Sequence, residues 1–198
     1  MTEFEHKPGA LSPSGFAAMM TNDRSGKNLG KTALEYATRI TLERMGVVIP
    51  EAYSKALDWG IENEEKALAY YEHLYGMVTP TGRLIHPELD YIAGTPDGLI
   101  GEDGIIEIKC PYNPMNHFAN LTQNAQLKDY GYQIQGYMWI TGRKWCDFVS
   151  FDPRFPESKR LHVVRVDRDN DVIENLAERA ALINSIVERN LGETESND

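Results

Sequence analysis

Two acidic residues and a lysine lie close together in the segment from residue 94 to 111. The segment predicts two short strands joined by a turn, because Asp-Gly between apolar runs is a strong hairpin signal. On the second strand, Glu107 and Lys109 are two residues apart, so the side-chain period of two places both on one face. Asp97 stands at the start of the first strand, and pairing across the hairpin brings it beside Glu107. The sequence therefore predicts that two carboxylates and an ammonium group converge on one point.

Such a set of side chains is suited to holding a divalent cation. Mg²⁺ prefers oxygen ligands and keeps several water molecules in its coordination shell, so a protein usually binds it through only one or two carboxylates. Two carboxylates held close together repel each other, and a cation removes that cost. A lysine beside the metal can orient or help deprotonate an attacking water and can offset charge in a phosphoryl-transfer transition state. The alternative is an exposed hairpin on which Glu107 and Lys109 form an ion pair of little energetic value.

Further candidates lie on predicted helices. Glu64 belongs to an acidic run that is either a solvated helix face or the source of a third carboxylate for the metal. Gln133 and Tyr137 are four residues apart and therefore share a helix face. They form either a simple polar–aromatic contact or a pair that faces the hairpin and helps to place water or phosphate.

The apolar periodicity predicts an α/β fold with a central mixed β-sheet flanked by helices. A kink or break is expected at Trp59–Gly60, and residues 111–116 read as a proline-rich exit from the hairpin. Predicted helices cover a short segment after Ser12 and residues 31–44, 54–75, 117–141 (one long helix or a broken one) and 171–191. Predicted strands cover residues 77–79, 83–86, the hairpin, 146–151 and 161–166.

Composition is typical of a soluble globular protein. The chain has 198 residues, of which 41% are hydrophobic and 25% charged, enough for one domain with a real core. We expect a single domain over 1–190, with an N-terminal helical part (12–75) packed on a sheet core (77–190), and an acidic flexible tail over 191–198. With no long apolar run or signal peptide, we expect a cytosolic protein without a membrane segment. The two cysteines, expected as free thiols, are Cys110 and Cys146.

The net charge of −10 argues against a protein that coats nucleic acid without specificity. It is compatible with an enzyme that binds DNA at a local basic surface and uses carboxylates to hold metal. The net charge therefore argues against a protein that coats nucleic acid, but it does not exclude an enzyme that acts on DNA.

Asp97 followed by Glu107-Ile108-Lys109 on an adjacent strand resembles the signature of the PD-(D/E)xK nucleases. Over residues 12–166 the chain resembles the lambda-exonuclease-like (YqaJ-type) phage recombination nucleases of that superfamily, which implies a restriction-endonuclease-like core. The likeness rests on landmarks that occur in this order and at these separations. They are Leu57-Asp58-Trp59-Gly60 with Glu64; Thr95-Pro96-Asp97-Gly98-Leu99; Glu107-Ile108-Lys109-Cys110-Pro111; and Gln133-Ile134-Gln135 with Met138-Trp139.

The resemblance also implies roles for single residues. One or two Mg²⁺ ions, with Mn²⁺ as a possible substitute, would be held by Asp97, Glu107, the backbone carbonyl of Ile108 and, partly through water, Glu64. Lys109 and Gln133 would position the nucleophilic water. Leu57 matches the position that wedges apart the terminal base pair, and Arg24 the position that contacts the minor groove. The residues expected to contact DNA or its 5′ phosphate are Lys7, Ser14, Thr95, Arg24, Leu57 and Tyr137.

The implied activity is Mg²⁺-dependent 5′→3′ digestion of one strand of linear duplex DNA to mononucleotides, leaving a 3′ single strand for recombination by strand annealing. Relatives form ring-shaped homotrimers around DNA and hand the single strand to an annealing protein. A phage or prophage origin and the cytoplasm of a bacterial host are implied as well. The alternatives are an endonuclease on the same fold, which should cut closed circles, and a catalytically silent DNA-end-binding module, against which the intact acid–acid–lysine set argues.

Overall fold

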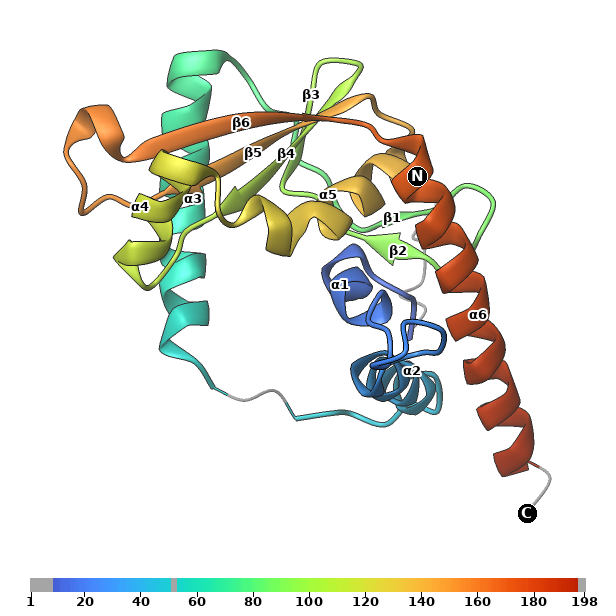
Figure 1. The fold of residues 1–198 in the computed structure, drawn as a ribbon. Coiled ribbons are helices and arrows are strands. Elements are labelled where there is room, and N and C mark those ends of the chain that lie inside the picture. The colour runs from blue at the N-terminus through green and yellow to red at the C-terminus, as the bar shows by residue number, and fades with distance from the viewer. Residues whose placement is uncertain (1–8, 51–52, 196–198) are drawn as a thin grey trace.

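The computed structural model describes residues 9–50 and 53–195 and shows a mixed α/β fold (Figure 1). Within these residues, no helix combines the length and the apolarity that a membrane crossing requires. The elements in chain order are η1 (Pro13–Gly15), α1 (Phe16–Met19), α2 (Lys31–Arg44), α3 (Lys55–Tyr75), β1 (Leu84–Ile85), β2 (Ala93–Gly94), β3 (Gly98–Ile100), β4 (Gly104–Lys109), α4 (Pro114–Gln123), α5 (Leu127–Thr141), β5 (Trp145–Phe151), η2 (Glu157–Lys159), β6 (Leu161–Asp167) and α6 (Asn170–Glu195).

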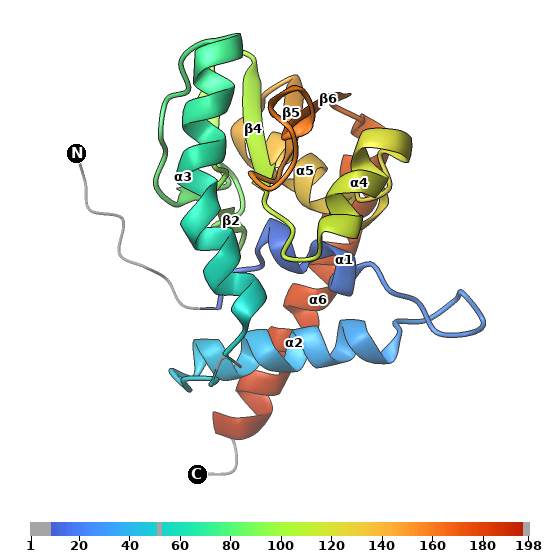
Figure 2. The same ribbon diagram turned by 90° about the vertical axis from the view of Figure 1, so that its left-hand side faces the viewer.

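A four-stranded mixed sheet lies between two helices, which confirms the predicted fold class. Its strand order is β3–β4–β5–β6, with β4 and β5 parallel and both outer pairs antiparallel. α3 lies on one face of the sheet and α5 on the other (Figure 2). Successive β4 side chains alternate between the two faces. The buried cluster on the α3 face comprises Ala67, Tyr71, Val78, Ile106, Ile108, Val149 and Phe151. The cluster on the α5 face comprises Ile105, Ile134, Tyr137, Met138, Cys146 and Phe148.

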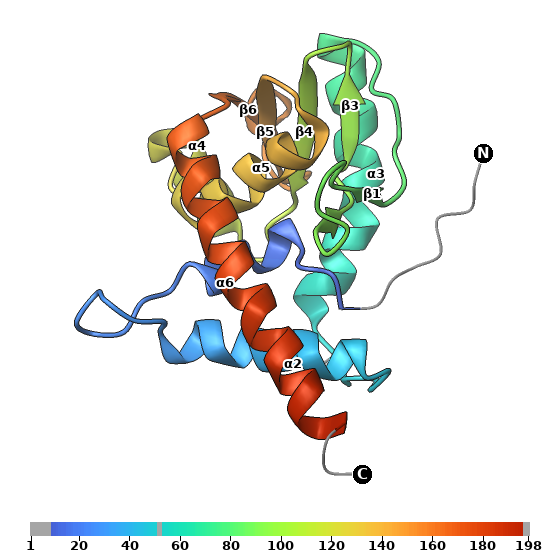
Figure 3. The ribbon, with the colours of Figure 1, turned by 90° about the vertical axis from the view of Figure 1, so that its right-hand side faces the viewer.

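A second layer brings the start and the end of the chain together. α6 crosses α2 beside α1, and the three helices share one apolar core (Figure 3). At the far end of α2, Arg44 is half-buried and donates hydrogen bonds to Glu188 and, at 2.7 Å, to Asn184 of α6. The same guanidinium donates to the carbonyl of Gly9 at 3.0 Å. One arginine thus joins α6 to α2 and to the chain leading into η1.

The helices predicted after Ser12, over 31–44 and over 54–75 are confirmed, and details of the others are corrected. α3 runs without interruption through Trp59–Gly60, where a kink or break was expected. The predicted 117–141 helix is the broken one of the two alternatives, because Asn124 adopts a left-handed conformation with φ of 50° between α4 and α5. α4 begins already at Pro114, inside the predicted exit, because Pro suits the first helical position and Asn113 Oδ1 accepts from Met115 N at 3.1 Å.

The remaining corrections concern strands and the C-terminal segment. The strand predicted over 77–79 is reduced to a single bridge between Thr79 and Leu99. The strand predicted over 83–86 is the two-residue β1, which pairs with β2 outside the main sheet. α6 continues to Glu195, so residues 191–195 are helical where a flexible tail was expected; residues 196–198 lie outside the described part of the chain. Cys110 and Cys146 are free, as predicted.

Arg143 holds the tip of the β3–β4 hairpin. The hairpin turns through Gly101, whose φ of 53° suits glycine. The Nη1 atom of Arg143 donates to the carbonyls of Gly101 and Gly104 at 2.8 Å each, and to that of Ile100 at 3.3 Å. Because Asp97 and Glu107 lie on this hairpin, its tip helps to set their register.

Replacing Arg143 is expected to loosen the hairpin. Arg143→Ala should lower the free energy of unfolding by about 1–3 kcal/mol, the usual value of hydrogen bonds to a charged donor. Equilibrium denaturation in urea measures the change. The matched control is Lys144→Ala, since the pair between Lys144 and Asp103 spans 3.1 Å between largely exposed side chains and should contribute almost nothing. Equal effects of the two substitutions would contradict the role of Arg143.

Candidate active site

Asp97 lies beside the middle of β4, as the hairpin predicts. The register pairs Gly98 with Ile106, so the preceding residue, Asp97, stands level with Glu107. Its Oδ2 atom accepts a hydrogen bond from the backbone N–H of Ile108 at 2.5 Å. Asp97 is half-buried, and one of its oxygens is thereby directed at the strand. The predicted juxtaposition of Asp97 and Glu107 is confirmed.

Glu107 is the buried centre of the site. Its side chain is almost fully buried, and its Oε1 atom receives Lys109 Nζ at 2.6 Å and Gln133 Nε2 at 2.7 Å. Lys109 Nζ also lies 4.6 Å from the ring centroid of Tyr130, a cation–π distance. The exposed-hairpin alternative is therefore wrong, because a surface ion pair would not be enclosed by a sheet and a helix.

One face of α5 covers these groups. Gln133 Nε2 also donates to Tyr137 Oη at 3.3 Å, so the pair predicted from its four-residue spacing does face the hairpin. Tyr130, three residues before Gln133, contacts Lys109 from the same helix face. Tyr130 was missed from the sequence, although its spacing from Gln133 was a usable signal. The helix thus presents two rings and an amide to the Glu107–Lys109 pair.

Burial and like charge make both carboxyl groups hard to ionise. Burial, together with the negative charge of Glu107, raises the pKa of Asp97 to about 8. Burial also raises the pKa of Glu107, more than Lys109 lowers it. Burial alone lowers the pKa of Lys109, but the adjacent Glu107 carboxylate outweighs it and the net shift is upward. Ionising both carboxyl groups would give more negative charge than the one ammonium group offsets, which favours a bound cation.

The donor set fits a hard metal ion. Glu107 Oε2 is buried and has no hydrogen-bond partner among the described residues, which is costly unless something binds there. No three His, Cys, Asp or Glu side chains in the described parts of the chain are grouped closely enough to hold an ion by themselves. Two carboxylates and the Ile108 carbonyl, with water completing the shell, match the coordination that Mg²⁺ prefers.

Glu64 lies across a hollow from this pair. It is exposed on α3 and lines a cavity of about 430 Å³ together with Asp97 and Ile108. Its charge contributes to the raised pKa values of Asp97 and Glu107. The structure therefore places Glu64 on the same cavity as Asp97.

An adjoining cavity of about 520 Å³ leads to Lys109. One wall of this cavity is the amino-terminal half of α3, with Leu57 and Glu64. The opposite wall is the end of β4 and the segment that follows it, residues 108–113. Leu57 is 52% exposed at the α3 wall. The residues of the opposite wall are Ile108, Lys109, Cys110, Pro111, Tyr112 and Asn113, and the remainder is completed by Ala56, Gly60, Ile61, Asn116, Gln126 and Tyr130.

The other predicted DNA contacts lie further out. Ser14 is exposed on η1, where its Oγ lies 3.0 Å from Ser12 Oγ. Its neighbour Pro13 packs so closely on Gly94 that an added Cβ there would lie 2.7 Å from Pro13 Cδ. Thr95, exposed directly after Gly94, therefore belongs to the same neighbourhood.

Arg24 is not brought to this neighbourhood. It is exposed on the 20–30 loop, which extends away from α3 in both side views (Figure 2, Figure 3). Lys7 lies outside the described residues. Two of the DNA-contact predictions therefore receive no support from the geometry.

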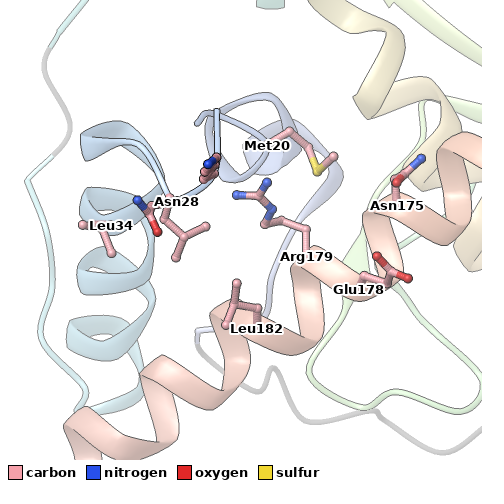
Figure 4. A pocket seen from close by; sticks show the side chains of 9 residues that line it. Met20, Asn28, Leu34, Asn175, Glu178, Arg179 and Leu182 are labelled. Atoms are coloured by element: carbon pink, nitrogen blue, oxygen red, sulfur yellow. The ribbon is translucent and has the colours of Figure 1, made fainter. Parts of the chain in front are cut away.

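A second hollow lies away from the carboxylates, between α2, the 20–30 loop and α6. Its volume is about 560 Å³, and Arg179 projects across it from α6 (Figure 4). Arg179 Nη2 donates to Asn22 Oδ1 at 2.7 Å, which ties the loop to α6. With Glu178 as its one acidic lining residue, this hollow lacks the paired carboxylates of the first site.

The fold is that of the alkaline exonucleases. The chain is similar to the alkaline exonuclease of Laribacter hongkongensis, with 29% identity, 96% of this chain and 94% of that one covered, and a TM-score of 0.87. The same enzyme in complex with dAMP matches at 30% identity, with 96% and 93% covered and a TM-score of 0.86. A phage-related exonuclease from Haemophilus somnus 129PT shares the fold at 22% identity, with 93% and 96% covered and a TM-score of 0.78.

The sequence matches the model of the YqaJ-like viral recombinase domain over residues 4–144. The chain belongs to this family, as the resemblance of its motifs indicated. A search of curated proteins gives no match.

Proposed function

We propose that this member of an exonuclease family digests one strand of linear duplex DNA in the 5′→3′ direction and depends on Mg²⁺, for which Mn²⁺ can substitute. The observation that carries the proposal is the Glu107 carboxylate, which binds Lys109 and Gln133 through one oxygen and leaves the other buried without a described partner. An exonuclease relative binds dAMP, the kind of product that such digestion releases.

The residues that would hold one or two Mg²⁺ ions are Asp97, Glu107, the Ile108 carbonyl and, partly through water, Glu64. A bound Mg²⁺ supplies a Lewis acid that polarises the scissile phosphate and neutralises its charge. The Lys109 ammonium and the Gln133 amide, which both contact Glu107, would orient the attacking water. Lys109 would also offset charge that develops on phosphorus-bound oxygen. The Tyr130 ring, 4.6 Å from Lys109 Nζ, would help to hold the ammonium in place.

The end of the duplex would enter along the α3 wall. Leu57 would separate the last base pair, and the hydroxyls of Ser14 and Thr95, with Lys7 and Tyr137, would receive the 5′ phosphate. Arg24 would contact the minor groove from its separate loop. A ring-shaped homotrimer is proposed because a ring can line its bore with basic groups and turn its acids to solvent, which suits a subunit with a net charge of −10.

The biological setting proposed is recombination of phage or prophage DNA in the cytoplasm of a bacterial host. The 3′ single strand left by digestion would pass to a single-strand annealing protein. Membership of a viral recombinase family supports this setting.

The test is incubation with Mg²⁺ and linear duplexes labelled at either end, beside a nicked and a closed circle. A 5′ label should appear at once as a mononucleotide, a 3′ label should stay on a shortening strand, and the closed circle should persist. Cutting of the closed circle would replace this function by that of an endonuclease. Binding of duplex ends without release of any mononucleotide would show that the protein is a catalytically silent DNA-end-binding module.

A further inference from the structure

Arg154 joins three segments of the chain that lie around the site. It follows β5, and its Nε and Nη2 atoms donate to the two carboxylate oxygens of Asp152 at 2.8 and 2.7 Å. Its backbone N–H donates to the same carboxylate at 3.0 Å. Asp152 is fully buried, and these bonds outweigh the effect of burial, so the pKa of Asp152 is lowered. The guanidinium is therefore held in one orientation against the end of the sheet.

Held in this way, the guanidinium reaches the two walls of the 520 Å³ cavity. Its Nη2 atom donates to the carbonyls of Pro111 and Tyr112 at 3.2 and 3.0 Å, directly after Lys109 and Cys110. Its planar face lies 4.3 Å from the ring centroid of Trp59 on α3. Trp59 and Tyr112 also meet edge to face, with centroids 6.3 Å apart. One side chain thus connects the α3 wall to the wall that leaves β4.

The amino-terminal half of α3 is largely exposed to solvent. Most residues from 53 to 62 are exposed, whereas Trp59 is half-buried. Leu57, Ile61 and Glu64, which line the cavity, follow one another at helical spacing, and Trp59 lies between the first two along the chain. The position of these lining residues relative to Lys109 therefore depends on how Trp59 is held.

We propose that Arg154 is a positioning residue, which sets the width of the cavity by fastening Trp59 of α3 to the chain that leaves β4. It acts through Trp59, Pro111 and Tyr112, since the described lining of the cavity does not include Arg154 itself. The inference rests on the proposed function, because the width matters when a DNA strand must pass Leu57 and Glu64 to reach Lys109. Small displacements of such walls cost much of the rate, on the order of 100-fold per ångström.

A second arginine provides a matched control. Arg165 on β6 binds the buried Asp147 through Nε and Nη2 at 2.8 and 2.9 Å and stacks 3.6 Å from the ring centroid of Trp145. The two arginines therefore have the same chemistry: a buried aspartate on one side and a tryptophan face on the other. They differ in that Arg154 also donates to the carbonyls of Pro111 and Tyr112, whereas Asp147 also accepts from Tyr71 Oη at 2.6 Å. Asp147, Trp145 and Arg165 are not among the described residues that line the cavity. A loss of general stability should therefore appear in both variants, and a change confined to the cavity only in the first.

The experiment compares Arg154→Lys with Arg165→Lys, since lysine keeps the charge and loses the planar fork. Arg154→Lys should lower kcat/KM on duplex ends by about 10- to 100-fold, and Arg165→Lys should stay within about twofold of wild type, both per folded molecule. Amide hydrogen exchange should become faster over residues 55–63 in Arg154→Lys alone, while the carboxyl-terminal half of α3 stays protected. Trp59→Leu, which leaves the Arg154–Asp152 pair in place, should reproduce both effects, and it serves as the test should Arg154→Lys fail to fold.

Each contrary outcome has a distinct meaning. Unchanged exchange over residues 55–63 would overturn the fastening of α3 by Arg154. Faster exchange with unaltered kcat/KM would overturn its importance for the reaction. Should the wild-type protein degrade no DNA, the proposed function fails, and the exchange measurement still decides whether Arg154 holds α3.

Discussion

Asp97→Asn should abolish Mg²⁺-supported cleavage, with a fall in kcat on the order of a thousandfold or more. Asparagine keeps an oxygen that can accept from the Ile108 N–H, now 2.5 Å from Asp97 Oδ2, so the hairpin should keep its geometry. What is lost is the negative charge that a hard cation requires. End-labelled duplexes measure the rate, and the control is Asp103→Asn at the exposed tip of the same hairpin, which should leave kcat unaltered.

The same substitution should stabilise the protein in EDTA. The pKa of Asp97 is raised to about 8, so the folded state binds a proton that the unfolded chain has released, and wild-type stability falls as pH rises from about 4 to 8. Asp97→Asn should show a smaller fall, to which Glu107 with its raised pKa still contributes, and should melt at a higher temperature than wild type at pH 7. Thermal unfolding across that range checks the sign. Added Mg²⁺ or Ca²⁺ should raise the melting temperature of wild type but not of the variant, and a metal-induced rise in both would remove Asp97 from the metal site.

Lys109→Met should lower kcat by about 100- to 10,000-fold, the usual range for a group that acts on a transferred proton. The ammonium lies 2.6 Å from Glu107 and 4.6 Å from the ring centroid of Tyr130, so methionine removes the charge while its chain can still occupy the space. Affinity for duplex ends, measured in Ca²⁺, should change little because the metal ligands remain. Single-turnover kinetics separate the two quantities.

Two further variants complete this test. Lys109→Arg should not restore turnover, because a planar fork cannot occupy the position of a compact ammonium group. Lys144→Met, at an exposed lysine near the hairpin tip, should behave as wild type. Turnover by Lys109→Met equal to that of wild type would exclude lysine from the mechanism.

The parts of the site that the sequence revealed are those whose geometry is local. Glu107 and Lys109 share a face because a strand repeats every two residues, and Asp97 meets them because the hairpin is short. Gln133 and Tyr137 share a helix face for an equally local reason. No such rule says where α5 packs, so the contact of Tyr130 with Lys109 appeared only in the structure.

Long-range contacts explain the remaining omissions. Arg154 reaches the carbonyl of Pro111, 43 positions earlier, and nothing in the spacing of the two residues predicts it. The amphipathic pattern showed that α2 and α6 each bury a face, but not that they bury them against each other. The split at Asn124 is different, since an Asn in the left-handed region is a known helix terminator and the sequence left that alternative open.

The pairing of α2 with α6 bears on how the protein is made. Arg44 contacts Glu188 across a separation of 144 residues, so the part of the α1–α2 core that packs on α6 stays uncovered on the ribosome until α6 has emerged. Contacts between residues so far apart in sequence slow folding. Until they form, the exposed apolar surface of α2 can associate with other unfolded chains.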